Sequence, residues 1–239
     1  MFRSGDTAGL HRMRASPYSG DNVVKIGPIH CVLFDLDGTL YDSPEYNRYF
    51  DSEMVNIVSN FLKIEPAEAS RILATRRKEK GTLTGAMESL GITRENFHAL
   101  VAERINPSLH LSPDERIRTV LSQLRSSGLK IGLVTNSGRN LVMKILDALG
   151  LEVENFDVVI TGTEVKPKPS HEPFLLALER LGCSIDETLY VGDRGEAEIR
   201  PAHDVGLKTV LISRVIDQKD SEWADAVIHD MTELEDLIT

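Results

Sequence analysis

The chain has 239 residues, of which 41% are hydrophobic and 27% charged, and its 37 acidic and 27 basic side chains give a net charge of −10. This apolar content is typical of folded proteins and excludes a wholly disordered chain. No run approaches the ~18–20 consecutive apolar residues of a transmembrane helix, so we expect no membrane partner. The acidity argues against binding to a nucleic-acid polymer. We expect a cytoplasmic globular protein, a monomer or dimer, with one large domain or a core carrying an inserted domain.

The first 28 residues differ in composition from the rest of the chain. They are rich in Gly, Ser and Arg and lack the apolar segment of a secretory signal. We expect residues 1–28 to form a flexible leader, with a transit peptide as the alternative.

The two cysteines, Cys31 and Cys183, are far apart in the sequence. Two such thiols do not make a disulfide framework, and no further ligands suggest a zinc site. Cys31 lies in an apolar run and is expected to be a small buried side chain. This cysteine usage is typical of a reducing, cytoplasmic setting.

The first predicted strand, residues 29–34, is followed by a long stretch with no convincing strand. Apolar residues recur there at the spacing of helices. This pattern predicts a helical cap inserted at residues 43–112, which leaves residues 29–42 and 113–239 as the core. The helical segments of the cap are predicted at 54–62, 67–78, 82–90 and 94–105.

Strands and helices alternate beyond the cap. Helices at 140–149 and 174–181 carry an apolar face and end at Gly150 and Gly182, which suit a helix C-terminus. The strands are short, β-branched and almost continuously apolar, as in parallel sheets covered on both faces. The predicted fold class is therefore α/β, a doubly wound parallel-sheet, Rossmann-like core with an inserted α-helical cap domain. The later strands are predicted at 130–135, 157–161, 188–191, 208–212 and 226–228.

Polar or charged residues follow four of these strands. Ligands of open α/β sheets bind at the carboxyl ends of the strands, so we expect these side chains to share one edge. Paired carboxylates such as Asp35 and Asp37 repel each other when buried, unless a cation lies between them. Together with Asp193 they supply the oxygen ligands that Mg²⁺ prefers. The residues after the four strands are Asp35 and Asp37, Thr135 and Asn136, Lys166 and Lys168, and Asp193.

This set of groups predicts phosphoryl chemistry. A carboxylate beside Mg²⁺ can attack phosphorus, and a second carboxyl group can act as general acid and then base. Thr135 and a lysine would stabilise the transition state. Ser137 is predicted to cap the following helix, because no Gly-x-Ser-x-Gly motif surrounds it.

Four motifs resemble those of the haloacid dehalogenase superfamily. The segment Asp35-Leu36-Asp37-Gly38-Thr39-Leu40 is similar to the first motif, and Thr135-Asn136-Ser137, Lys168 and Gly192-Asp193 are similar to the others in order. The resemblance covers residues 29–212. It implies a Rossmann-like core, a type-1 helical cap, Mg²⁺ and an aspartyl-phosphate intermediate.

The resemblance also implies roles for individual residues. Asp35 would be the nucleophile and Asp37 the general acid and base. Asp35, Asp193 and the main-chain carbonyl of Asp37 would hold the metal. The phosphate-binding residues would be Thr135, Asn136 and Lys168.

Two lysines are candidates for the family position, and the last motif departs from the usual family pattern. The family lysine usually precedes Pro and lies six residues before a Phe, which favours Lys168, with Phe174, over Lys166. The second aspartate of the last motif is replaced by Glu198, which is predicted as a metal ligand acting through water. Its longer side chain moves the carboxylate, so weak activity or an unusual metal preference is expected.

A basic cluster, residues 76–80, lies inside the cap. With Gly81, Thr82 and Gly85, it weakly resembles the pyrimidine 5′-nucleotidase-like branch of the superfamily. One interpretation is that it draws a phosphate ester toward the site. The other is a solvated helix end, where cations favour the helix dipole.

These features predict a Mg²⁺-dependent phosphomonoester hydrolase that acts on a small phosphorylated metabolite, such as a nucleotide, phosphoglycolate or a sugar phosphate. Two alternatives stay open. One is a phosphosugar mutase of the same fold. The other, which rests on Glu198, is a catalytically weak phosphate-binding regulatory protein.

Overall fold

The computed structural model describes residues 25–214 and 221–238. The predicted leader, residues 1–28, therefore lies outside the described residues except for residues 25–28. Within these four, Ile26 is buried, and its N–H donates to the carbonyl of Leu237 at 2.8 Å.

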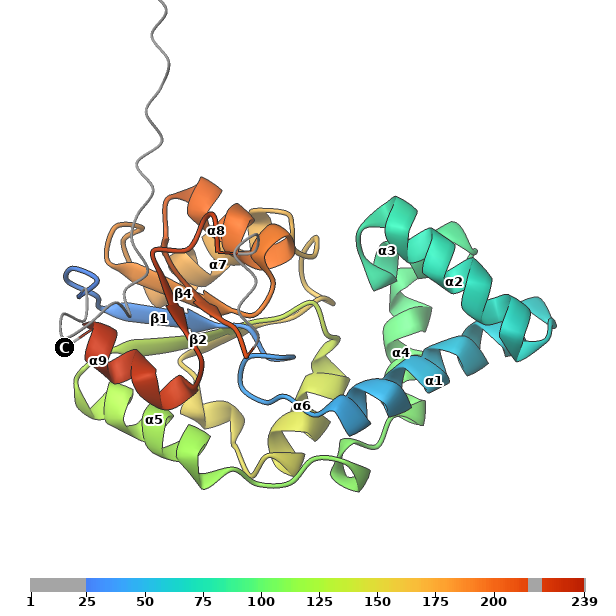
Figure 1. Cartoon of the computed structure of the whole chain (residues 1–239), viewed down its shortest axis with the longest axis horizontal. Helices are drawn as coiled ribbons and strands as arrows, with labels where there is room; N and C mark the ends of the chain where they lie inside the picture. Colours follow the sequence, from blue (N-terminus) through green and yellow to red (C-terminus); the bar gives the residue numbers. More distant parts are fainter. Residues whose placement is uncertain (1–24, 215–220, 239) are drawn as a thin grey trace, which may run out of the picture.

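Six parallel strands form one sheet in the order β3-β2-β1-β4-β5-β6 (Figure 1). All six predicted strands are present, and the Rossmann-like α/β fold is confirmed. Because β1 lies between β2 and β4, the strand order reverses there, which is where open α/β sheets bind ligands. The strands are β1 (Cys31–Phe34), β2 (Lys130–Val134), β3 (Val158–Ile160), β4 (Thr188–Gly192), β5 (Lys208–Ile212) and β6 (Ala226–Ile228).

Helices cover both faces of the sheet (Figure 1). One face is covered by α5 (Glu115–Ser126), α6 (Arg139–Ala148) and α9 (Leu234–Ile238), and the other by α7 (Glu172–Leu181) and α8 (Arg200–Val205). This double cover buries all four residues of β1. The predicted helices at 140–149 and 174–181 correspond to α6 and α7. The latter starts earlier than predicted because Pro173 is tolerated in the first turn, where its missing N–H has no partner to lose.

Four helices lie between β1 and β2 in the sequence, where the cap is predicted. They are α1 (Pro44–Leu62), α2 (Pro66–Lys80), α3 (Leu83–Ser89) and α4 (Arg94–Arg104). The hydroxyl of Ser43 caps α1 by accepting from the N–H of Tyr46, and Pro44 fits the first turn. Figure 1 shows the four helices grouped to one side of the sheet. The exact division into domains at residues 43 and 112 stays a prediction.

No helix in the part of the chain that the structure describes combines the length and apolar character needed to cross a bilayer.

The two cysteines are paired, which neither their separation in the sequence nor the expected reducing setting predicts, whereas Cys31 is buried as predicted. The structure joins Cys31 and Cys183 in a disulfide, with Cα atoms 6.5 Å apart, within the usual range for such bridges. Cys31 begins β1 opposite Thr188 of β4, and Cys183 lies just before that strand. The pairing of β1 with β4 therefore brings together two residues separated by 152 positions.

Candidate active site

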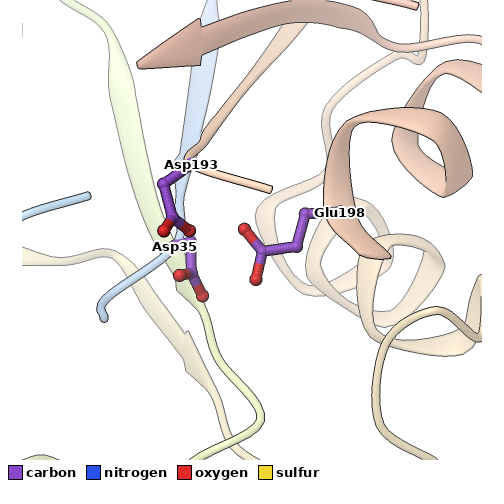
Figure 2. Close-up of side chains that lie close together, drawn as sticks. All are labelled: Asp35, Asp193 and Glu198. Atoms are coloured by element: carbon purple, nitrogen blue, oxygen red, sulfur yellow. The ribbon is translucent and has the colours of Figure 1, made fainter. Parts of the chain in front are cut away.

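The candidate site lies where β1 and β4 end side by side. Phe34 pairs with Val191 across these strands, and the N–H of Asp35 donates to the Val191 carbonyl at 2.9 Å. Asp35 and Asp193 therefore leave neighbouring strands at the same edge. Figure 2 shows their carboxylates close together, with that of Glu198 facing them. The structure thus unites residues that the sequence places at separate strand ends.

Lys168 reaches this edge from the loop between β3 and α7. Its buried ammonium group donates to Asp35 Oδ1 at 2.5 Å and to Glu198 Oε1 at 3.2 Å. The Tyr190 hydroxyl, at 2.8 Å, and the Val134 carbonyl, at 3.0 Å, complete its surroundings. Lys166 is exposed. The structure therefore places Lys168 beside the predicted nucleophile.

The side chain of Asn136 positions the Lys168 main chain. Asn136 Oδ1 accepts from the Lys168 N–H at 2.7 Å, and Nδ2 donates to the Lys168 carbonyl at 2.9 Å. The hydroxyl of Thr135 accepts from the Ser137 N–H at 3.1 Å and keeps its own proton for donation. The phosphate contacts of Thr135, Asn136 and Lys168 stay predictions.

Three carboxylates form a compact cluster suited to a cation. Asp35, Asp193 and Glu198 each offer a ligand oxygen within 4.8 Å of the others. Among the described residues, three buried oxygens of this cluster lack a hydrogen-bond partner: Asp35 Oδ2, Asp193 Oδ1 and Glu198 Oε2. Buried anionic oxygens need compensation, and oxygen donors are the ligands that Mg²⁺ prefers. The donor set and its unpaired oxygens fit a divalent cation.

Glu198 reaches the cluster despite being longer than the aspartate usual at this position. It lies in the π-helical turn Gly195–Ile199 and is completely buried. Gly192 makes room for it, since a Cβ there would lie 2.8 Å from Glu198 Oε2. The Arg194 guanidinium donates to Oε1 of the same carboxylate. One oxygen of Glu198 is thus bound by Lys168 and Arg194, and the other faces the cluster.

The charged groups of the cluster shift one another's pKa values. Burial, reinforced by the Glu198 charge, raises the pKa of Asp35 to about 7, although Lys168 and Arg194 oppose the rise. Burial, with Glu198 and Asp35, raises the pKa of Asp193 to about 8. Burial also disfavours ionised Glu198, but Lys168 and Arg194 outweigh it and lower the pKa of that carboxyl. Protonation of an aspartate relieves the repulsion, and so does a bound divalent cation.

The side chain of Asp37 has different partners. The Tyr41 hydroxyl donates to Oδ1, and Ser137 Oγ donates to Oδ2 at 2.9 Å. Burial and the charge of Asp37 raise the pKa of Tyr41 well above its usual value, so the hydroxyl stays a donor. The predicted capping role of Ser137 is wrong, because Gly138 is the N-cap residue of α6. Any metal contact of Asp37 through its main-chain carbonyl stays a prediction.

Three residues of this network are not predicted from the sequence: Tyr41, Tyr190 and Arg194. Arg194 carries a usable signal, since it lies four residues before Glu198, where side chains of one helical turn meet. Tyr41 lies four residues after Asp37, but no helical turn joins them, so spacing does not predict their contact. Tyr190 belongs to β4, where an apolar role is the default expectation.

A cavity of about 430 Å³ lies between this site and the helices of residues 43–112. Arg77 is the member of the basic cluster that lines it, and it pairs with Asp51 at 3.1 Å. Arg76 pairs with Glu79 at 2.8 Å. Other lining residues include Asp37, Lys168 and Asp193 from the core and Tyr46, Phe97 and His98 from the cap.

The fold and the site define a class of α/β enzymes in which paired aspartates follow the first strand of a parallel sheet. Residues 32–212 match the haloacid dehalogenase-like hydrolase family. The chain belongs to this family and is a hydrolase.

Similar proteins are phosphatases by name. The chain is 32% identical over 225 residues to the glyceraldehyde 3-phosphate phosphatase of Methanocaldococcus jannaschii, covering 87% of this chain and 96% of the relative. It is 32% identical over 182 residues to the phosphoglycolate phosphatase of Yersinia pseudotuberculosis, covering 72% and 75%. The solved structure of a HAD phosphatase from Thermococcus onnurineus superposes with a TM-score of 0.69 at 28% identity, covering 88% and 98%. These similarities support a phosphatase-type hydrolase.

Proposed function

We propose that this protein is a Mg²⁺-dependent phosphomonoester hydrolase that acts on a small phosphorylated metabolite through an aspartyl-phosphate formed on Asp35. The observation that carries the proposal is the Asp35 carboxylate, which is buried at the end of β1 and bound by Lys168 at 2.5 Å. The curated relatives described above are named for glyceraldehyde 3-phosphate and phosphoglycolate. Both are small phosphate esters, which supports a substrate of this size.

Asp35, Asp193 and Glu198 are the side chains that would hold Mg²⁺, because each offers an oxygen within 4.8 Å of the others. When bound, the ion supplies positive charge that balances the carboxylates and polarises the phosphoryl group.

In the first step, an Asp35 carboxylate oxygen attacks phosphorus. The bond between phosphorus and the leaving oxygen breaks, and Asp37 gives its proton to that oxygen. Tyr41 and Ser137 hold the Asp37 carboxyl group in place for this transfer. Lys168 and the Thr135 hydroxyl stabilise the negative charge on the phosphoryl oxygens.

In the second step, Asp37 accepts a proton from water as the water oxygen attacks phosphorus. The bond between phosphorus and Asp35 breaks, which releases inorganic phosphate and restores the carboxylate. The same group thus serves as acid and then as base.

Phosphate release from p-nitrophenyl phosphate tests this proposal. We expect turnover with Mg²⁺, its loss on chelation with EDTA, and a decrease of at least about a thousandfold for Asp35→Asn. Asp147→Asn, the same change at an exposed site on α6, is the matched control and should retain full activity. Full Mg²⁺-dependent activity in Asp35→Asn would refute the mechanism. With a sugar phosphate as substrate instead, an isomerised product with little free phosphate would support the mutase alternative.

A further inference from the structure

Two buried polar groups in the wall of the cavity lack partners. Tyr46 of α1 and His98 of α4 both line the cavity, and they are only 2% and 8% exposed. Among the described residues, neither the Tyr46 hydroxyl nor His98 Nε2 has a hydrogen-bond partner. Such groups are rare in folded proteins because burial without a partner is unfavourable. Because both groups lie beside the candidate site, they point to a ligand that forms hydrogen bonds with them.

Both groups are uncharged near neutral pH. Burial, then the nearby charge of Asp37, raises the pKa of Tyr46, and the neighbouring Tyr41 hydroxyl opposes only part of the rise, so the Tyr46 hydroxyl keeps its proton. Burial, then the charge of Arg94, lowers the pKa of His98, so its imidazole is neutral. A phenol donates or accepts, and a neutral imidazole offers one donor and one acceptor. These are suitable partners for hydroxyl or carbonyl groups.

The cap side of the cavity also has no net charge. Among the described residues 43–112 that line it, the charged side chains are Arg77 and Asp51, which pair with each other at 3.1 Å. A second carboxylate or phosphate on a substrate would have to compete with Asp51 for Arg77. A hydroxylated, uncharged group meets no such competition. The remaining polar residues of this wall, besides Tyr46 and His98, are Asn47, Thr82 and Thr84.

We infer that the leaving group of the substrate is uncharged and hydroxylated, as in a polyol or sugar phosphate, and that Tyr46 and His98 bind it. This inference rests on the proposed function, because it takes the leaving group to lie in the cavity beside Asp37. Both residues are thus assigned to specificity, whereas Asp35 and Asp37 carry the reaction.

Steady-state kinetics with Mg²⁺ and four phosphate esters test the inference. Glycerol 3-phosphate and ribose 5-phosphate carry hydroxyl groups, 2-phosphoglycolate carries a carboxylate, and phenyl phosphate carries neither. We expect kcat/KM for the better hydroxylated ester to exceed that for 2-phosphoglycolate at least about tenfold. Tyr46→Phe should lower this kcat/KM about tenfold, mainly through KM, and lower that for phenyl phosphate less than about twofold. His98→Phe should act in the same direction.

The thermal midpoint separates binding from structural support. Tyr46→Phe removes an unpaired hydroxyl, so its Tm should equal or exceed that of the unaltered protein. Tyr49→Phe is the matched control on the same helix, because the Tyr49 hydroxyl bonds to Arg104 and Asn106 at 3.1 Å. Its Tm should fall, and its preference among the esters should not change.

The possible results distinguish failure of this inference from failure of the proposed function. An equal loss with phenyl phosphate and the hydroxylated esters would show that Tyr46 serves Asp37 or the fold, and would overturn the inference. A preference for 2-phosphoglycolate, or no preference, would also overturn it and leave the phosphatase proposal standing. Failure of the unaltered protein to release phosphate from any ester would overturn both.

Discussion

The buried ammonium group of Lys168 sets the charge balance of the site. Three carboxylates, those of Asp35, Asp193 and Glu198, face one another, and Lys168 contacts two of them. A buried ion pair is weak evidence for stability, but removal of one partner leaves uncompensated charge. Lys168 therefore matters to the fold as well as to the proposed chemistry.

Lys168→Met keeps much of the side-chain length and removes the charge. We expect it to lower the free energy of unfolding of the metal-free protein by about 3–5 kcal/mol. Mg²⁺ should recover part of this loss, because it supplies charge to the same carboxylates. Urea denaturation with and without Mg²⁺ measures both effects.

Lys166→Met is the matched control, since Lys166 is exposed two positions away. Its effect should stay within about 0.5 kcal/mol. Similar losses in the two variants would contradict the assignment of Lys168 to the site.

At the scale of elements, the turn after β1 must pass very close to the end of β4. Gly38 has a φ of +85°, and a Cβ on it would lie 2.2 Å from Asp193 Oδ2. The turn therefore needs glycine for its backbone conformation and for space. This contact links the first motif to the last through main-chain geometry.

Gly38→Ala should disturb both the fold and the position of Asp193. We expect a free energy of unfolding at least about 2 kcal/mol lower and kcat/KM for p-nitrophenyl phosphate at least about a hundredfold lower. Gly128→Ala is the control, because Gly128 has a φ of +83° but open space around it among the described residues, and it does not line the cavity. It should show the strain of positive φ alone, about 1 kcal/mol. Equal effects at both positions would argue against the close approach to Asp193.

Hydrophobic periodicity does not predict every helix of the structure. The helices α8 and α9 have only six and five residues, too few for an apolar pattern to repeat. The helix α5 is also not predicted, although Val120, Leu121 and Leu124 are buried on one face. Periodicity predicts α6 and the second half of α1, because apolar residues recur there at helical spacing.

At the scale of the whole molecule, the site makes stability depend on pH. The pKa of Asp35 rises from 3.8 in its ordinary state to about 7, and that of Asp193 rises to about 8. A raised pKa means that the folded protein holds a proton that the unfolded chain has lost. The stabilisation from these groups is therefore complete below about pH 3.8 and decreases as pH rises toward 7–8.

We expect the metal-free protein to have a Tm at least about 3 °C lower at pH 8.5 than at pH 6. Mg²⁺ should raise Tm more at pH 8.5, because protons and the cation compete for the same carboxylates. Differential scanning calorimetry at the two pH values, with EDTA or Mg²⁺, measures this. Asp193→Asn removes one titrating group and should flatten the dependence. A Tm that rises over this interval would contradict the charge balance proposed for the site.

The six strands and the parallel α/β class could be inferred from the sequence alone, and so could the strand ends at which the candidate site lies. Strands buried on both faces appear in the sequence as short apolar runs. The polar and charged residues of the candidate site follow directly after those runs. Asp35 and Asp193 could thus be placed at one edge, and the lysine-to-phenylalanine spacing of the family favoured Lys168, which the structure places beside Asp35. These features are local in the chain, so they can be inferred without knowing which strands are neighbours.

The contacts between residues far apart in the chain follow from the tertiary structure. The disulfide between Cys31 and Cys183 depends on the pairing of β1 with β4. The contact of Ser137 with Asp37 and that of Asn136 with Lys168 join separate loops at one sheet edge. These partnerships have no sequence signature, because they depend on the order of strands and the paths of loops. The same holds for the cavity, whose wall combines helices of residues 43–112 with strand ends far away in the chain.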